Sequence, residues 1–222
     1  MSLRNTAVLL AGFVAAGCAG LEHQGAYAPK AFATWKVAED QRVDGRALVI
    51  TSAADDAAVF SGPPTGTMGF ATILTAPLGV ITREAAVRVF GDLFRGGAEA
   101  RQGEAEAVTG AVVLSPRVTK FTYRYSLLAA FLQLDLHLAC RGADGRVIYD
   151  KTLDSGELEI ATGRDQDPPA RKVVDAAHVA IQALMLEAAG EFKDQLVEGG
   201  ARAAPAGSTD TDPGSPPPPG SR

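Results

Sequence analysis

The chain has 222 residues, with 21 Lys and Arg against 26 Asp and Glu, and so carries a net charge of −5. This length suits one domain with a sizeable core rather than two large domains. Because an acidic surface repels phosphates, the charge balance disfavours nucleic acid as a partner. With only 2 cysteines, a disulfide framework is excluded as the source of stability, so packing must supply it.

The N-terminus has the pattern of a bacterial lipoprotein signal. Arg4 precedes an apolar run from Ala7 to Val14, and the small residues at 15–17 lead directly to Cys18. This pattern predicts that residues 1–17 are removed and that acyl chains on Cys18 anchor the protein to a membrane without crossing it. The alternative, an uncleaved membrane-spanning helix, is disfavoured because glycines interrupt an uncharged stretch that is barely as long as the roughly 20 residues a span needs. Ala19 is not the Asp of an inner-membrane retention signal, which by analogy favours the outer membrane.

Composition divides the rest of the chain into three parts. Residues 18–45 show no sustained periodicity and are predicted to be a membrane tether, whose later part around Trp35 and Val37 packs on the domain. Residues 46–198 are predicted to form a periplasmic α/β domain. Residues 199–222, rich in Gly, Ala, Ser, Thr and Pro, are predicted to be a disordered tail, although the proline run at 216–219 is also compatible with a polyproline ligand for a partner.

The first half of the domain predicts two strands and a helix. Residues 47–51 form an apolar run typical of a strand buried near the middle of a sheet, and residues 70–75 are predicted to return beside it. The loop at 61–69 between them cannot cradle a phosphate, because no Gly-Lys-Ser/Thr ending follows and its two prolines lack backbone donors. A helix capped by Thr82 is predicted to end at Gly96-Gly97, and residues 98–107 to be a polar linker.

The second half predicts long strands and a closing helix. A strand is expected over 108–114, interrupted at Pro116 and resumed over 118–125, followed by a strand at 132–138 in which leucine alternates with mostly polar residues. A two-residue Asp144-Gly145 turn would pair Ala143 with Arg146 and set Leu136 opposite Leu153 and Cys140 opposite Tyr149. A helix opening at Pro168-Pro169 carries a stripe that should cover the leucine face: Val173, Ala177, Ile181, Leu184, Ala188, Phe192 and Leu196. The fold class predicted is α+β, with one mostly antiparallel sheet of about four to five strands and two helices on one face.

Little in the sequence points to catalysis. The predicted register places Asp135 opposite Asp154 with His137 nearby, which are ligand types that a divalent metal accepts, but an ordinary solvated strand face is the commoner meaning of such a group. The chain has no Gly-x-Ser-x-Gly, Cys-x-x-Cys or His-Glu-x-x-His motif. Cys140 belongs to the leucine face and is predicted to be a buried, unreactive thiol. We therefore expect no enzyme activity, no cofactor and no metal.

Two groups of residues are candidates for contact with a partner protein. Phe121, Tyr123 and Tyr125 alternate with polar residues and so share one face, which is either core or a protein-binding surface. Pro63 and Pro64 lie in the turn-rich loop at 61–69.

These features resemble a family. The lipobox, Pro77-Leu78-Gly79 before the first helix, the Ala143-Asp144-Gly145-Arg146 turn after the leucine strand and the closing helix are similar to small bacterial envelope lipoproteins of the YajG type. They are also similar to the auxiliary lipoproteins of envelope transporters and to the N-terminal module of TolB. The resemblance implies an α/β sandwich that binds or assembles other components and supplies no catalytic residues.

The sequence thus predicts an outer-membrane lipoprotein with a periplasmic domain that binds an envelope protein, through an exposed sheet edge or the 61–69 loop. One alternative is an auxiliary transport component that holds a small ligand or lipid between sheet and helices. A metal-binding enzyme using Asp135, His137 and Asp154 is the other.

Overall fold

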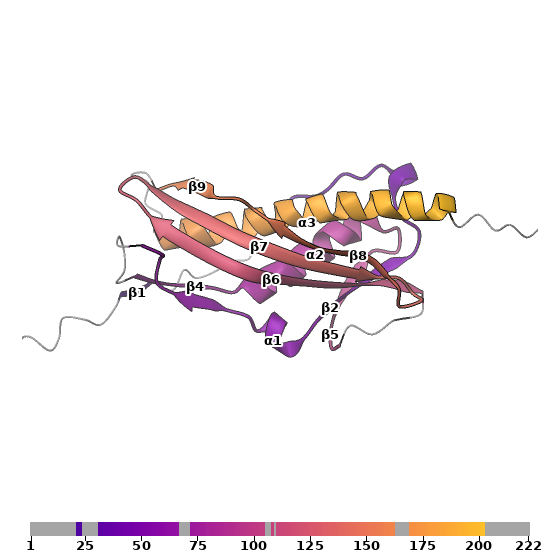
Figure 1. Cartoon of the computed structure of the whole chain (residues 1–222), viewed down its shortest axis with the longest axis horizontal. Coiled ribbons are helices and arrows are strands. Elements are labelled where there is room, and N and C mark those ends of the chain that lie inside the picture. The colour runs from indigo at the N-terminus through magenta and orange to yellow at the C-terminus, as the bar shows by residue number, and fades with distance from the viewer. Residues whose placement is uncertain are drawn as a thin grey trace, which may run out of the picture.

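The computed structural model describes residues 21–23, 31–66, 72–104, 108, 110–162 and 169–202. It has the predicted α+β fold, in which two long helices pack against a mixed, mostly antiparallel sheet (Figure 1). The strands are β1 (Leu21–His23), β2 (Arg46–Thr51), β3 (Phe60–Gly62), β4 (Thr72–Ala76), β5 (Ala98–Gln102), β6 (Ala111–Tyr125), β7 (Ala129–Arg141), β8 (Val147–Asp154) and β9 (Leu158–Ala161). The helices are α1 (Ala53–Asp56), α2 (Leu78–Leu93), α3 (Pro169–Arg202) and a 3-10 turn at Glu39–Gln41.

The main sheet has six strands, in the order β5-β2-β6-β7-β8, with β9 also paired to β7. The prediction that β2 is a central strand is confirmed: it lies parallel to β5 on one side and to β6 on the other, and both of its faces are buried. The prediction of a polar linker at 98–107 was wrong for its first five residues, because Ala98–Gln102 form β5, the edge strand of the sheet. Its Ala and Glu residues have low strand propensity, so the pairing with β2 is what makes this segment a strand.

A second, three-stranded sheet lies outside the main one. The segment expected at 70–75 does not return beside β2; instead, β4 pairs antiparallel with β3 and parallel with β1. The physical reason is that β5 and β6 already occupy both edges of β2.

Strand β6 is continuous through Pro116, where the sequence predicted an interruption. β2 pairs with β6 only as far as Leu114, so beyond that residue β6 has β7 on one side and no β2 ladder on the other. A proline without an N–H is tolerated at such an edge position. The irregularity in the pairing with β7 falls instead between Val118 and Lys120.

The β7–β8 hairpin has the predicted strand register and a different loop. Leu136 lies opposite Leu153 and Cys140 opposite Tyr149, as predicted. However, the Gly142 N–H donates to the Arg146 carbonyl oxygen at 2.8 Å, so the loop has three residues, and the register shifts next to it. Gly145 has φ 80°, which is the left-handed residue that such a loop and bulge require.

Helix α2 begins five residues earlier than the sequence predicted, at Leu78, with Pro77 at the cap position instead of Thr82. Thr82 is therefore buried in the helix and is not its cap. The Gly79 N–H donates to the Ala58 carbonyl at 2.9 Å, and the backbone of α1 lies directly against this glycine. Contact with α1, rather than a capping side chain, thus accompanies the start of α2.

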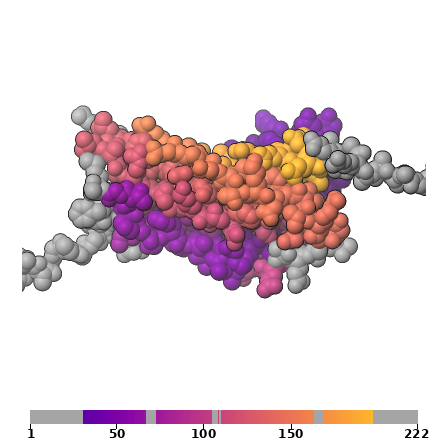
Figure 2. Space-filling view, viewed as in Figure 1, coloured from indigo at the N-terminus to yellow at the C-terminus, as the bar shows by residue number. Residues whose placement is uncertain are grey.

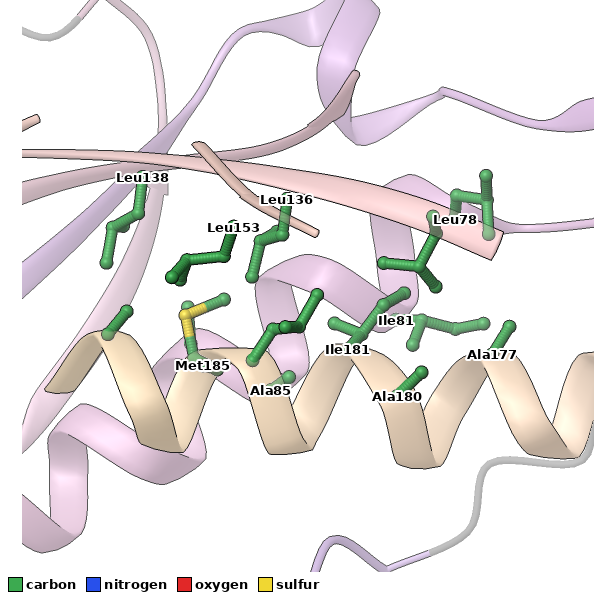
Figure 3. Close-up of a cluster of buried hydrophobic side chains, with 14 of the residues drawn as sticks. Leu78, Ile81, Ala85, Leu136, Leu138, Leu153, Ala177, Ala180, Ile181 and Met185 are labelled. Atoms are coloured by element: carbon green, nitrogen blue, oxygen red, sulfur yellow. The ribbon is translucent and has the colours of Figure 1, made fainter. Parts of the chain in front are cut away.

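Helix α3 covers the leucine face of the sheet, as predicted. Leu136, Leu138 and Leu153 point from β7 and β8 toward Ile181 and Met185 of α3 (Figure 3), and all five are buried. Residues 169–196 are long and apolar enough to cross a membrane, but this helix lies against the sheet and most of it is buried inside the domain. The helix extends to Arg202, four residues into the segment predicted as tail, and residues 203–222 lie outside the described part of the chain.

The described end of the predicted tether is held against the domain. Phe32, Trp35, Val37 and Val43 pack on the core. The backbone N–H of Trp35 donates to the Asp92 carboxylate of α2 at 2.9 Å, so this segment is fixed to the same helix that packs on the sheet.

Candidate functional site

The predicted lipidation site precedes the described residues in the sequence. Cys18 and the signal residues 1–17 are outside the described residues, and β1 begins at Leu21, three residues after the cysteine. β1 is paired to β4 through Leu21 opposite Thr72 and His23 opposite Leu74. The small sheet is thus the first described part of the domain after the proposed anchor.

The weak metal candidates do not form a ligand set. Asp135 lies opposite Asp154, as predicted, but the His137 Nε2 lies 2.9 Å from the Asp150 Oδ1. The Gln133 amide donates to both oxygens of Asp154 at 3.3 Å. The backbone N–H of Gly156, followed by this amide, lowers the pKa of Asp154. Within the described ranges, no three His, Cys, Asp or Glu residues come together in a way that could hold a metal ion.

The remaining thiol has no nucleophilic character. Cys140 is fully buried on the leucine face. Burial, and to a smaller extent the Asp150 carboxylate, raises the pKa of this thiol well above its ordinary value. A thiol that stays protonated and inaccessible is a packing residue.

The aromatic stripe joins the two sheets. Phe121 and Tyr123 are buried, and the Phe60 ring of β3 lies 4.6 Å from the Phe121 ring and 5.9 Å from the Tyr123 ring, between centroids. The Tyr123 hydroxyl donates to the Gly62 carbonyl at 2.9 Å, and burial, with Tyr125 nearby, raises the pKa of Tyr123 to about 12. Phe121 and Tyr123 therefore pack inside the domain and do not present a free surface to a partner, whereas Tyr125 is half-buried.

The proline-containing loop is tied to the same strand. Pro63 is exposed and Pro64 is buried. Thr65 donates to the Tyr123 carbonyl from both its N–H, at 2.7 Å, and its hydroxyl, at 3.0 Å. Of the two proline candidates, only Pro63 is available for contact; residues 67–69 of this loop lie outside the described part.

An open groove of about 550 Å³ lies between α2 and the edge strand β5. Ala98 and Ala100 line one wall, and the other carries Val87 with charged residues of both signs, including Arg88 and Asp92. The charged residues of β5 are not part of this lining: Glu99 contacts Arg46 and Arg101. The groove thus combines a small-residue strand edge with an apolar and charged helix face.

A second hollow, of about 570 Å³, lies at the turn between β6 and β7. Leu127 and Leu128 at this turn are 84% and 83% exposed, more than any other large hydrophobic side chain that the structure describes. Sequence reasoning missed both surfaces. The sequence did contain a signal for the hollow at the β6–β7 turn. Leu127 and Leu128 lie between two strand patterns, where a short turn normally has polar residues.

Comparisons with known proteins assign no family. No family model matches the chain, and no curated protein matches it. A solved structure described as a "putative lipoprotein" from Caulobacter crescentus is 16% identical, with a TM-score of 0.34 over 59% of this chain and 88% of that chain. A minor lipoprotein from Acinetobacter baumannii is 12% identical, with a TM-score of 0.36 over 70% of this chain and 95% of that one. A hypothetical protein from Chlamydia trachomatis is 10% identical, with a TM-score of 0.37 over 66% and 98% of the two chains. The similarity to these bacterial proteins is distant.

Proposed function

We propose that this protein is a lipoprotein of the bacterial outer membrane whose periplasmic domain binds another envelope protein and catalyses no reaction. The observation that carries the proposal is the small-residue run ending at Cys18, placed three residues before the first described strand. A diacylated cysteine at that position attaches the domain to a membrane. The resemblance of its motifs to YajG-type lipoproteins points the same way.

We place the binding surface at β5 and the groove beside it. β5 is paired on one side only, to β2, so its outer edge leaves backbone groups available to a partner strand. Pairing with such an edge gives affinity through main-chain hydrogen bonds, and a neighbouring pocket selects side chains. The short side chains of Ala98 and Ala100 leave room in the groove for side chains of a partner, and Val87 offers an apolar contact.

The alternative uses of the domain have less support in the described residues. The space between β7 and α3 that a lipid or small ligand would need is filled by side chains with no exposed surface, such as Leu134, Leu136 and Ile181. Among the described residues, those of the metal hypothesis do not come together as a set of three possible ligands.

The anchor is tested by fractionation. Cys18→Ala is expected to move the protein from the membrane fraction to the soluble fraction, and mass measurement of the native protein should show acyl chains on Cys18. A Cys18→Ala protein that stays with the membranes would contradict the proposal.

The binding surface is tested by site-specific photocrosslinking in cells. A photoreactive amino acid at Ala100 should give a discrete crosslinked protein, and Val87→Asp in the same chain should abolish it by placing a charge in the groove. The matched control is Val179, which is 64% exposed on α3. The same crosslinked protein from Val179, or none from Ala100, would remove β5 as the binding surface.

A further inference from the structure

The turn between β6 and β7 carries two leucines that the fold does not use. Ser126 and Ala129 close this turn through the Ser126 N–H, which donates to the Ala129 carbonyl at 2.8 Å. Leu127 and Leu128 occupy its two central positions, almost wholly exposed. Such positions are normally filled by Asn, Asp, Gly or Ser, which hydrogen-bond locally and face water. Two adjacent exposed leucines contribute nothing to the core and favour an apolar environment outside the domain.

Strand β1, which follows the proposed anchor in the sequence, lies at the same end of the molecule as the turn that carries Leu127 and Leu128, the leucine turn. Figure 1 shows β1 and the β6–β7 turn together at the left end of the elongated fold, and the C-terminal end of α3 at the right end. Pairing explains this arrangement: β1 pairs with β4, β4 places Leu74 opposite Gly62, and the Tyr123 hydroxyl near the end of β6 donates to Gly62. In the space-filling view, pink atoms from the end of β6 and the start of β7 project at this end (Figure 2).

The chain between Cys18 and Leu21 is too short to separate the two. Three extended residues span at most about 11 Å. Acyl chains on Cys18 would therefore hold this end of the domain, and not the end formed by the β7–β8 turn, within about that distance of the bilayer surface. The surroundings of the turn suit an interface between lipid and water. The Arg124 guanidinium beside it is paired with Glu157 at 2.8 Å, so no unpaired charge of this residue has to approach the bilayer.

We propose that Leu127 and Leu128 insert into the lipid bilayer that carries the acyl chains of Cys18, so that the domain stands on this end with α3 directed away from the membrane. The inference rests on the proposed lipidation. The acyl chains supply the affinity, and the leucine turn sets the orientation, which in turn places the β5 groove at a fixed position relative to the bilayer.

The test measures depth in the membrane on the acylated, full-length protein. Trp35, the only tryptophan, is replaced (Trp35→Phe), and a reporter is introduced by Leu127→Trp. The protein is reconstituted into phosphatidylcholine vesicles with and without lipid that bears a nitroxide on the upper acyl chain. The matched control is Val147→Trp in the same background, since Val147 is also exposed but lies beside the opposite turn.

The expected result is a shift of emission to shorter wavelength and a loss of fluorescence with nitroxide lipid for Leu127→Trp, and neither change for Val147→Trp. A reporter at 127 that stays in water on a protein whose mass shows the acyl chains overturns the inference and leaves the turn as a docking position for protein, while the proposed anchor stands. Equal quenching at both positions also overturns it, because the domain then lies flat on the membrane. A mass without acyl chains removes the anchor and the inference together.

Discussion

A single methyl group at Gly79 should destabilise the domain, although the same change in a helix usually does the reverse. Replacing glycine by alanine inside a helix is worth up to about 1 kcal/mol of stability through backbone entropy. At Gly79, however, a Cβ atom would lie 2.1 Å from the Asp55 carbonyl oxygen and 2.5 Å from that of Asp56. Both obstacles are backbone atoms of α1, so no side-chain rotation can relieve the contact.

The clash should outweigh the gain in helix propensity. Forcing an extra methyl into a packed site costs about 1 to 3 kcal/mol. A displacement of α1 would also disturb the hydrogen bond from the Gly79 N–H to the carbonyl oxygen of Ala58, which follows α1 in the chain. Because the Cβ would meet backbone atoms that cannot rotate away, we place the cost of the clash in the upper part of this range, at about 2 to 3 kcal/mol. After subtraction of the propensity gain of about 1 kcal/mol, we expect Gly79→Ala to lower the free energy of unfolding by about 1 to 2 kcal/mol.

The assay is urea unfolding of the protein without its leader, with Cys18 replaced to keep it soluble. With a slope near about 2 kcal/mol per molar urea, the midpoint should fall by about 0.5 to 1 M. Gly190→Ala in α3 is the matched control, because its Cβ would meet nothing within 4 Å, and it should raise the midpoint slightly. If both substitutions stabilise the protein to the same extent, the close packing of α1 on α2 is refuted.

Two further predictions concern the packing of α3 on the sheet. Leu136 is fully buried and faces α3, so Leu136→Ala should lower the free energy of unfolding in urea by about 2 to 5 kcal/mol. Leu127→Ala, at the exposed turn, should change it by less than about 0.5 kcal/mol. Equal effects of the two substitutions would contradict the burial assigned to these leucines. Glu191 of α3 accepts hydrogen bonds from Lys151 at 2.6 Å and Tyr149 at 2.9 Å, and the Lys151 bond is the larger cause of its lowered pKa. Because a carboxylate with a lowered pKa stabilises the fold above its ordinary pKa, Glu191→Gln should be destabilising at pH 7, and this difference should shrink as the pH falls through the folded-state pKa. A difference that does not change between pH 7 and pH values below the ordinary glutamate pKa of about 4.3 would show that the charge plays no part.

The sequence by itself determined the parts of this protein that depend on local pattern. Alternating leucines defined β7, the need to keep leucines together on one face gave the register that sets Leu136 against Leu153, and the stripe beginning at Val173 identified the helix that covers them. The loop of this hairpin was not predicted correctly, since it has three residues where the sequence indicated two. In each case the period of the apolar residues leaves one face that only burial can satisfy.

Only the tertiary structure decided what depends on pairing between distant segments. β5 is a strand because the edge of β2 is available to it, and β4 joins a second sheet because that edge is then occupied. The same holds for the candidate surfaces. The groove beside β5 exists only because α2 packs next to that strand. The leucine turn is a candidate membrane contact only because it lies at the same end of the domain as β1. Proximity in space between residues far apart in the chain has no counterpart in local hydrophobic period, so these features could not be predicted from it.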